Sequence, residues 1–176
     1  KDSIFEIGLT PNRVDGASHL GTARDLQATT NAKVNLPNDE IEFTTDSPLE
    51  ISIENNKDCK RYAGVCISNI TVAPSPEWLQ LKLRSIGLTP INNIVDATNY
   101  ILHDLGQPLH AFDLEKITSN KINIKNLANK TKFTTLDEEK RELVSTDLMI
   151  CNEKGGMCLA GVFGGIDSGV KLETTT

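Results

Sequence analysis

Residues 87–113 hold the pattern that most limits how this chain can fold, with the sequence GLTPINNIVDATNYILHDLGQPLHAFD. Pro90 disfavours a helical conformation in the residue before it, so we expect a helix to begin only after this point. Gly106 is typical of a helix end, and Pro108 lies too close behind it for the helix to continue. Between them, apolar residues recur at helical spacing, which predicts a helix near Val95–Leu105.

The same stretch brings three polar side chains toward an otherwise apolar region. Thr98 lies on the apolar face of the predicted helix, and Asn99 has Val95 and Leu102 one turn away. His110 follows in a loop next to a proline, and loops on rigid scaffolds often carry function. Each residue also has a plain structural explanation, since a helical Thr can bond the preceding turn and a lone His is most often structural. As a set, the three indicate a small polar pocket about as strongly as they indicate structural roles.

The rest of the chain predicts an α+β fold, because helical patterns in the first half give way to short strands in the second. We expect two further helices, at about His19–Thr29 and from about Glu77, the latter ended by Gly87. Its predicted buried stripe consists of Trp78, Leu81, Leu83 and Ile86. The predicted strands are Ile4–Leu9, Leu49–Ile53, Arg61–Val72, Ile122–Asn126, Lys132–Thr135, Glu142–Val144, Leu148–Cys151 and Met157–Val162. Alternating residues make Arg61–Val72 the clearest of them.

Composition limits the class of partner. The chain has 176 residues and a formal net charge of −6, which repels polyanions, so an RNA partner would need a local basic strip or another part of an assembly. Such a strip would consist of Lys121, Lys125, Lys130, Lys132, Lys140 and Arg141, although solvated strand faces explain these residues better. No apolar stretch approaches the ~20 residues of a membrane span. The four cysteines fit reduced core thiols in a cytoplasmic protein.

The segment Leu159–Gly165 predicts a strand that runs into a glycine-rich turn, where small residues let a ligand or another backbone approach closely. Neither of the glycine patterns that hold ATP or NAD is present, and no spacing indicates a metal site. By themselves, the residues therefore predict a cytoplasmic α+β domain with a small polar pocket, without a cofactor or metal of its own.

The sequence resembles the B3/B4 region of the β subunit of bacterial phenylalanyl-tRNA synthetases. The resemblance is carried by residues 87–113 and by three further blocks, IFEIGLTPNRVDGASHLGTARDLQA, RYAGVCISNI and LAGVFGGIDSGV. It implies an α+β fold in which residues 1–176 form one editing domain, with B3 segments flanking and interleaved with B4. In that family a Glu that recognises the tyrosine hydroxyl follows the glycine block, so the resemblance also implies a domain truncated at its C-terminal end.

For function, the resemblance implies post-transfer editing, in which tyrosine wrongly esterified to tRNA(Phe) is removed by hydrolysis. It implies Thr98, Asn99 and His110 as catalytic residues, and a substrate pocket formed by Pro108, Ala160, Gly161 and Gly164. The implied partners are the acceptor end of tRNA(Phe), the tyrosine or phenylalanine moiety and the α subunit of an (αβ)2 enzyme. ATP and Mg²⁺ would act elsewhere in that enzyme, and no membrane is implied.

Two alternatives stay open at this point. The chain can be a non-catalytic module that positions RNA or packs against another subunit. It can also be a free-standing B3/B4 protein that edits in trans.

Overall fold

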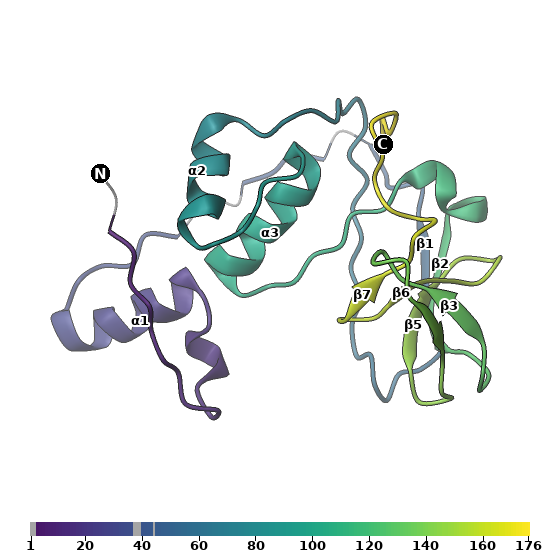
Figure 1. The fold of residues 1–176 in the computed structure, drawn as a ribbon, viewed down its shortest axis with the longest axis horizontal. Coiled ribbons are helices and arrows are strands. Elements are labelled where there is room, and N and C mark those ends of the chain that lie inside the picture. Colours follow the sequence, from purple (N-terminus) through teal and green to yellow (C-terminus); the bar gives the residue numbers. More distant parts are fainter. Residues whose placement is uncertain (1–2, 37–39, 44) are drawn as a thin grey trace. The chain divides into compact units, whose positions relative to one another are not determined.

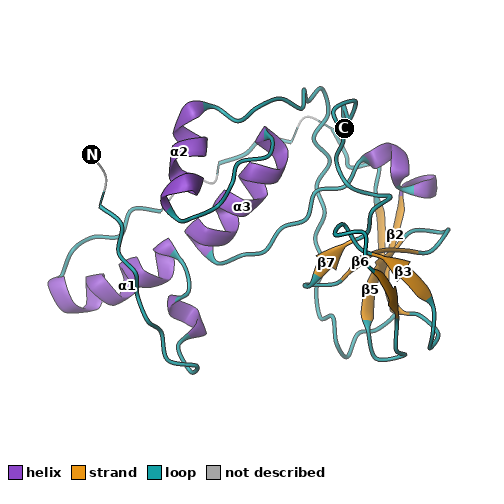
Figure 2. Cartoon of the chain, in the orientation of Figure 1, coloured by secondary structure: helices purple, strands orange, loops and turns teal. Residues whose placement is uncertain are grey.

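The computed structural model describes residues 3–36, 40–43 and 45–176, and within them the chain forms two compact units (Figure 1). One consists of residues 1–43 and 73–110 and contains the long helices. The other consists of residues 44–72 and 111–176 and contains the strands (Figure 2). The α+β class predicted from the sequence is confirmed.

The helical unit contains α1 (His19–Thr30), α2 (Glu77–Ser85) and α3 (Asn93–Leu105), preceded by a short 3-10 turn at Val14–Gly16. All three α-helices lie where the sequence predicts them, because their ends are encoded locally. The Ser18 hydroxyl caps α1 by accepting from the Gly21 amide at 2.9 Å. Gly87 and Gly106 follow α2 and α3 with φ of 83° and 78°, the left-handed region that glycine adopts most readily.

The buried face of α2 differs from the predicted stripe. Leu79 and Leu83 are buried, whereas Trp78, Leu81 and Ile86 are about half exposed. Trp78 instead contacts Tyr100 of α3 edge to face, with 5.6 Å between the ring centroids. The prediction was wrong for three of its four residues, because periodicity marks apolar positions but does not say which side of the helix meets its neighbour.

The strand unit is built on a five-stranded sheet in the order β1-β2-β5-β6-β7. Strand β1 pairs with β2 in parallel and the other neighbours are antiparallel, while β3 and β4 form a separate hairpin. Isoleucines of β2 and β5 form most of the buried core with Ile117, Met157 and Cys158. The strands are β1 (Glu50–Ile53), β2 (Lys121–Asn126), β3 (Lys132–Thr134), β4 (Lys140–Glu142), β5 (Leu148–Cys151), β6 (Gly156–Leu159) and β7 (Phe163–Gly164). Two 3-10 turns, Leu114–Lys116 and Thr118–Asn120, precede β2.

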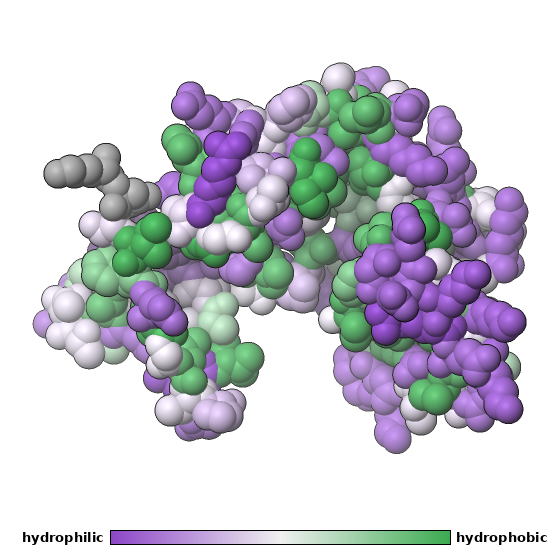
Figure 3. Space-filling view, viewed as in Figure 1, coloured by the Kyte–Doolittle hydropathy of each residue, from purple (hydrophilic) through white to green (hydrophobic). Residues whose placement is uncertain are grey.

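Two predicted strands are wrong: neither Ile4–Leu9 nor Arg61–Val72 pairs with another strand among the described residues. The second segment packs Tyr62 against the sheet core, and the Ile70 amide donates to the Thr175 carbonyl at 3.1 Å. Its Val65 and Ile67 remain exposed, as do several apolar side chains of both units in Figure 3. Alternation predicts a pleated segment, but only a hydrogen-bonding partner makes it a strand.

No helix in the described part of the chain is long and apolar enough to cross a lipid bilayer.

Candidate functional site

Helix α3 holds the first two predicted site residues at fixed positions. Its first turn is capped by Asn92, whose side-chain oxygen accepts from the Ile94 and Val95 amides at 3.1 and 2.9 Å. The Thr98 hydroxyl donates to the Val95 carbonyl at 2.7 Å, the structural role expected of a helical threonine. Because the Thr98 oxygen keeps a free lone pair, it can still accept a hydrogen bond from a ligand.

Asn99 lies beside Thr98 and is half-buried. The structure records no hydrogen bond for its side-chain amide within the described residues. An amide carries two donors and an acceptor, and a half-buried one has less water available to satisfy them. Asn99 is therefore better placed than Thr98 to bind a polar ligand.

The loop after α3 carries Pro108 and His110, and both are exposed. The Gln107 side chain donates to the Pro108 carbonyl at 3.2 Å. Although the His110 ring reaches solvent, the protein atoms around it desolvate the imidazole and lower its pKa below the usual value. At neutral pH the ring is therefore mostly uncharged, and one nitrogen can accept a proton.

The three predicted small residues lie in the strand unit. Ala160 is half-buried, packs against the sheet core and donates its amide to the Leu148 carbonyl at 2.9 Å. Gly161 has φ of 72° and open space where a Cβ would be, so the turn there depends on its backbone freedom. Gly164 is buried in β7.

The predicted residues thus belong to two units: Thr98, Asn99, Pro108 and His110 to the helical unit, and Ala160, Gly161 and Gly164 to the strand unit. A single site made of all seven stays a prediction.

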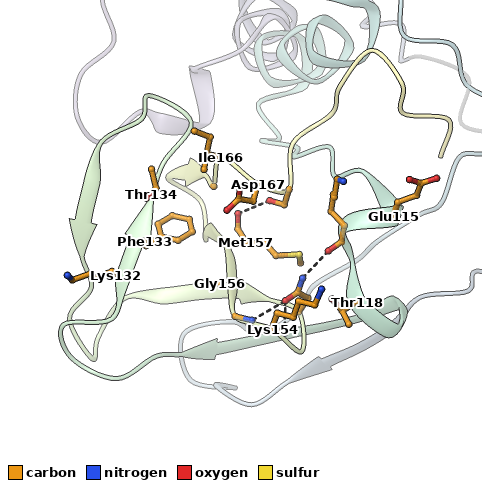
Figure 4. Close-up of a pocket in the computed structure, with 15 residues that line it drawn as sticks. Glu115, Thr118, Lys132, Phe133, Thr134, Lys154, Gly156, Met157, Ile166 and Asp167 are labelled. Atoms are coloured by element: carbon orange, nitrogen blue, oxygen red, sulfur yellow. Dashed lines mark hydrogen bonds between the residues drawn. The ribbon is translucent and has the colours of Figure 1, made fainter.

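The strand unit also contains a cavity of about 560 Å³ that sequence reasoning missed (Figure 4). Phe133 and Met157 are the buried apolar residues of its lining, and Figure 4 shows Lys132 and Glu115 at opposite sides of the group. The Asn152 side chain donates to the Lys116 carbonyl at 3.0 Å and so ties the turn after β5 to the 3-10 turn before β2. The remaining lining residues are Thr118, Thr134, Lys154, Gly155, Gly156, Gly165, Ile166, Asp167 and Ser168.

The chemistry of this cavity differs from that of the predicted site. None of the seven predicted residues lines it, and its lining includes no histidine or cysteine. Ser168 is the buried hydroxyl of the lining, and it donates to the Met157 carbonyl at 3.0 Å. This hydroxyl therefore gives its proton to a backbone carbonyl rather than to a base that would activate it as a nucleophile. Its residues come from distant parts of the chain, and no sequence motif indicates it.

Gly165 closes one wall of the cavity. A Cβ at this position would lie 2.7 Å from the Met157 carbonyl oxygen and 2.9 Å from the Phe133 ring. We therefore expect Gly165→Ala to lower the free energy of unfolding by about 2 kcal/mol, through overpacking against a backbone atom that cannot move aside. Thermal unfolding followed by circular dichroism measures this. Gly155→Ala is a poor control because φ there is 154°; Gly8→Ala, where a Cβ meets nothing within 4 Å, is the matched one. An equal loss in both variants would contradict the prediction.

The lysine strip considered from the sequence is partly neutralised. Lys121 pairs with Glu50 and Glu153 at 3.7 and 3.6 Å. Lys125 pairs with Glu54 at 4.0 Å, and Arg141 pairs with Asp137 at 2.9 Å. These pairs favour solvated strand faces over a phosphate-binding strip.

The cysteines fit the structural interpretation. All four are free, and burial raises the pKa of the Cys151 and Cys158 thiols to about 11. Both thiols are therefore protonated at neutral pH and poor nucleophiles. Among residues 3–36, 40–43 and 45–176, no group of three or more His, Cys, Asp or Glu side chains is arranged to hold a metal ion.

Sequence comparison decides the family. A model of the B3/4 domain matches residues 58–176, two thirds of the chain. The chain belongs to the B3/4 domain family. The match includes all seven predicted site residues, whereas α1 and β1 lie outside it. Assignment of the whole of residues 1–176 to one interleaved domain stays a prediction.

Relatives of this B3/4 chain are β subunits of phenylalanine–tRNA ligase. The Bacteroides thetaiotaomicron subunit is 49% identical over 182 residues, and the Carboxydothermus hydrogenoformans subunit is 46% identical over 176 residues. Each alignment covers 99% of this chain and 22% of the relative, so the chain spans about a fifth of the length of these proteins.

Among solved structures, an N-terminal fragment of the phenylalanyl-tRNA synthetase beta-subunit from Pyrococcus horikoshii matches 93% of this chain and 50% of that chain. The TM-score is 0.45 and the sequence identity is 19%.

Proposed function

We propose that this B3/4 chain is the editing part of a phenylalanine–tRNA ligase β subunit and hydrolyses the ester of tyrosine wrongly attached to tRNA(Phe). The observation that carries the proposal is the 49% identity to such a β subunit over 99% of the chain. The proposed partners are the acceptor end of tRNA(Phe) and the α subunit, in the cytoplasm. ATP and Mg²⁺ would serve the aminoacylation core rather than this domain.

The need for such a step follows from how pockets discriminate. A pocket shaped for phenylalanine rejects an analogue with one added hydroxyl only about 100-fold. A second site that hydrogen-bonds the phenol reverses the preference, because phenylalanine bound there would leave buried polar groups unpaired. Editing after transfer therefore removes tyrosine that the phenylalanine-binding pocket fails to reject.

The proposed roles follow from the local chemistry of each residue. The half-buried Asn99 amide and the Thr98 oxygen would hydrogen-bond the aminoacyl ester, and the neutral His110 ring would orient the hydrolytic water. Ala160, Gly161 and Gly164 would leave room for the tyrosyl ring, and Pro108 is proposed as a further substrate contact. The terminal ribose hydroxyl of the tRNA can assist the water, so that no strong protein base is required.

Deacylation of Tyr-tRNA(Phe) by the ligase that carries this chain tests the proposal. We expect His110→Ala to slow this hydrolysis about 100-fold, because removing a group that orients water or transfers a proton costs rate on this scale. Charging of tRNA(Phe) with phenylalanine serves as the control and is expected to stay within twofold. Unchanged deacylation in the variant would favour a non-catalytic packing module instead.

A further inference from the structure

Asp96, in the first turn of α3, is a fully buried carboxylate that the roles above do not use. One carboxylate oxygen accepts from the Ser75 hydroxyl at 2.5 Å. The other accepts from the Ile91 amide at 2.8 Å. Both donors lie outside α3, so this side chain ties the helix to the segment before α2 and to the loop that leads into α3.

A second pair of hydrogen bonds acts on the same turn. The Asn93 amide donates to the Ala73 carbonyl at 2.9 Å, and the Asn93 side-chain oxygen accepts from the Ala73 amide at 3.1 Å. Asn93 and Asp96 therefore both hydrogen-bond to one short segment, residues 73–75. Two such anchors on one turn prevent the helix from rotating about its axis.

The energetics make simple packing a poor explanation of Asp96. Burying a carboxylate costs several kcal/mol, and apolar side chains of similar volume often fill such places at lower cost. Two direct donors and the positive end of the helix dipole offset the cost here. Unlike an apolar residue, a carboxylate fixes the orientation of the helix that carries it, because its two oxygens accept hydrogen bonds only from donors at defined angles.

The rotation of α3 about its axis sets where the Asn99 side chain lies, since Asn99 is three residues further along the helix. A side-chain end lies about 5 Å from a helix axis, so a rotation of about 10° moves it by about 1 Å. A misplacement of about 1 Å in a reacting group can cost about 100-fold in rate.

We infer that Asp96 is a positioning residue for the editing site: through Ser75 and Ile91 it sets the rotation of α3 and thereby the direction of the Asn99 amide. The inference rests on the proposed function, because Asn99 matters only if it contacts the aminoacyl ester.

A double-mutant cycle between positions 96 and 99 tests the inference, with deacylation of Tyr-tRNA(Phe) by the complete ligase as the readout. We expect Asp96→Ala to lower kcat about 10-fold with KM within twofold. Asp96→Asn, whose amide can still accept from Ile91 and donate to the Ser75 oxygen, is expected to recover most of that loss. In an Asn99→Ala background, Asp96→Ala is expected to cause less than a twofold further loss.

Each alternative result has a separate meaning. If the loss of kcat in the double variant equals the product of the losses in Asp96→Ala and Asn99→Ala, the inference is overturned. That result is expected when Asp96→Ala only unfolds part of the protein, because unfolding lowers the active fraction equally with and without Asn99. If Asn99→Ala leaves deacylation unchanged, the proposed site itself is wrong and the inference falls with it.

Two further variants keep the test decisive if Asp96→Ala folds poorly. Ser75→Ala removes one of the two donors and is expected to lower kcat about threefold, again only when Asn99 is present. Asp104→Asn makes the same carboxylate-to-amide change on a partly exposed position of α3, and we expect it to leave kcat within twofold. An equal loss in Asp104→Asn and Ser75→Ala would overturn the inference.

Discussion

Asp96→Ala is expected to lower the free energy of unfolding of the helical unit by about 3 kcal/mol. The substitution leaves the Ser75 hydroxyl and the Ile91 amide without their acceptor, and each hydrogen bond to a charged group contributes about 1.5–3 kcal/mol. Trp78 provides the measurement, because it is the single tryptophan of the chain and contacts Tyr100 of α3. Its fluorescence during urea unfolding therefore reports the contact between α2 and α3.

The matched control for this experiment is Asp104→Ala. Asp104 lies on the same helix, and its ion pair is with a His19 nitrogen at 3.7 Å, on a mostly exposed ring. Surface pairs of this kind contribute about 0–1 kcal/mol. If the two variants unfold at the same urea concentration, Asp96 does not anchor α3.

Ala160→Trp is expected to reduce hydrolysis of Tyr-tRNA(Phe) at least 100-fold while phenylalanine charging continues. An indole in place of the methyl group would occupy the space that the proposed function assigns to the tyrosyl ring. Loss of about 3 kcal/mol of substrate binding corresponds to about a 100-fold loss in kcat/KM. The measurement is the rate of Tyr-tRNA(Phe) deacylation by the complete ligase at limiting substrate.

In this variant, overpacking of the sheet core must be distinguished from blocking of the proposed tyrosyl pocket, because Ala160 contacts the sheet core. Overpacked cores lose about 1–3 kcal/mol, which circular dichroism detects as a lower melting temperature. Val144→Trp places the same side chain at an exposed position of the same unit. Near-normal editing by folded Ala160→Trp protein would remove Ala160 from the proposed pocket.

Signals in adjacent residues predict the positions of the helices and of some strands. Gly106 ends α3 where the sequence predicts, whereas the helix begins at Asn93, two residues before the predicted Val95, because the Asn92 side chain caps it. Strands β2 and β5 lie within one residue of their predicted bounds. In β2 buried isoleucines alternate with polar residues, and β5 is a short apolar run at a central position of the sheet. Strand β4 lies two residues earlier than predicted, because a hairpin sets its register through the partner strand.

Long-range pairing explains the predictions that were wrong. Arg61–Val72 alternates like a strand, yet it pairs with no other strand among the described residues. The alternating pattern does not show whether a partner strand is present. An acidic residue in the first turn of a helix is favoured by the helix dipole alone, whereas the complete burial of Asp96 depends on Ser75, 21 residues earlier. The cavity beside Phe133 likewise joins four separate stretches of chain.

The sequence by itself determined the family, the α+β class, the positions of the helices and the residues to examine as a site, because blocks of residues and capping signals are properties of adjacent positions. Only the tertiary structure decided which face of α2 is buried, which lysines have acidic partners and that Asp96 anchors α3. Those features depend on contacts between residues distant in the chain, whose free energies no local pattern contains.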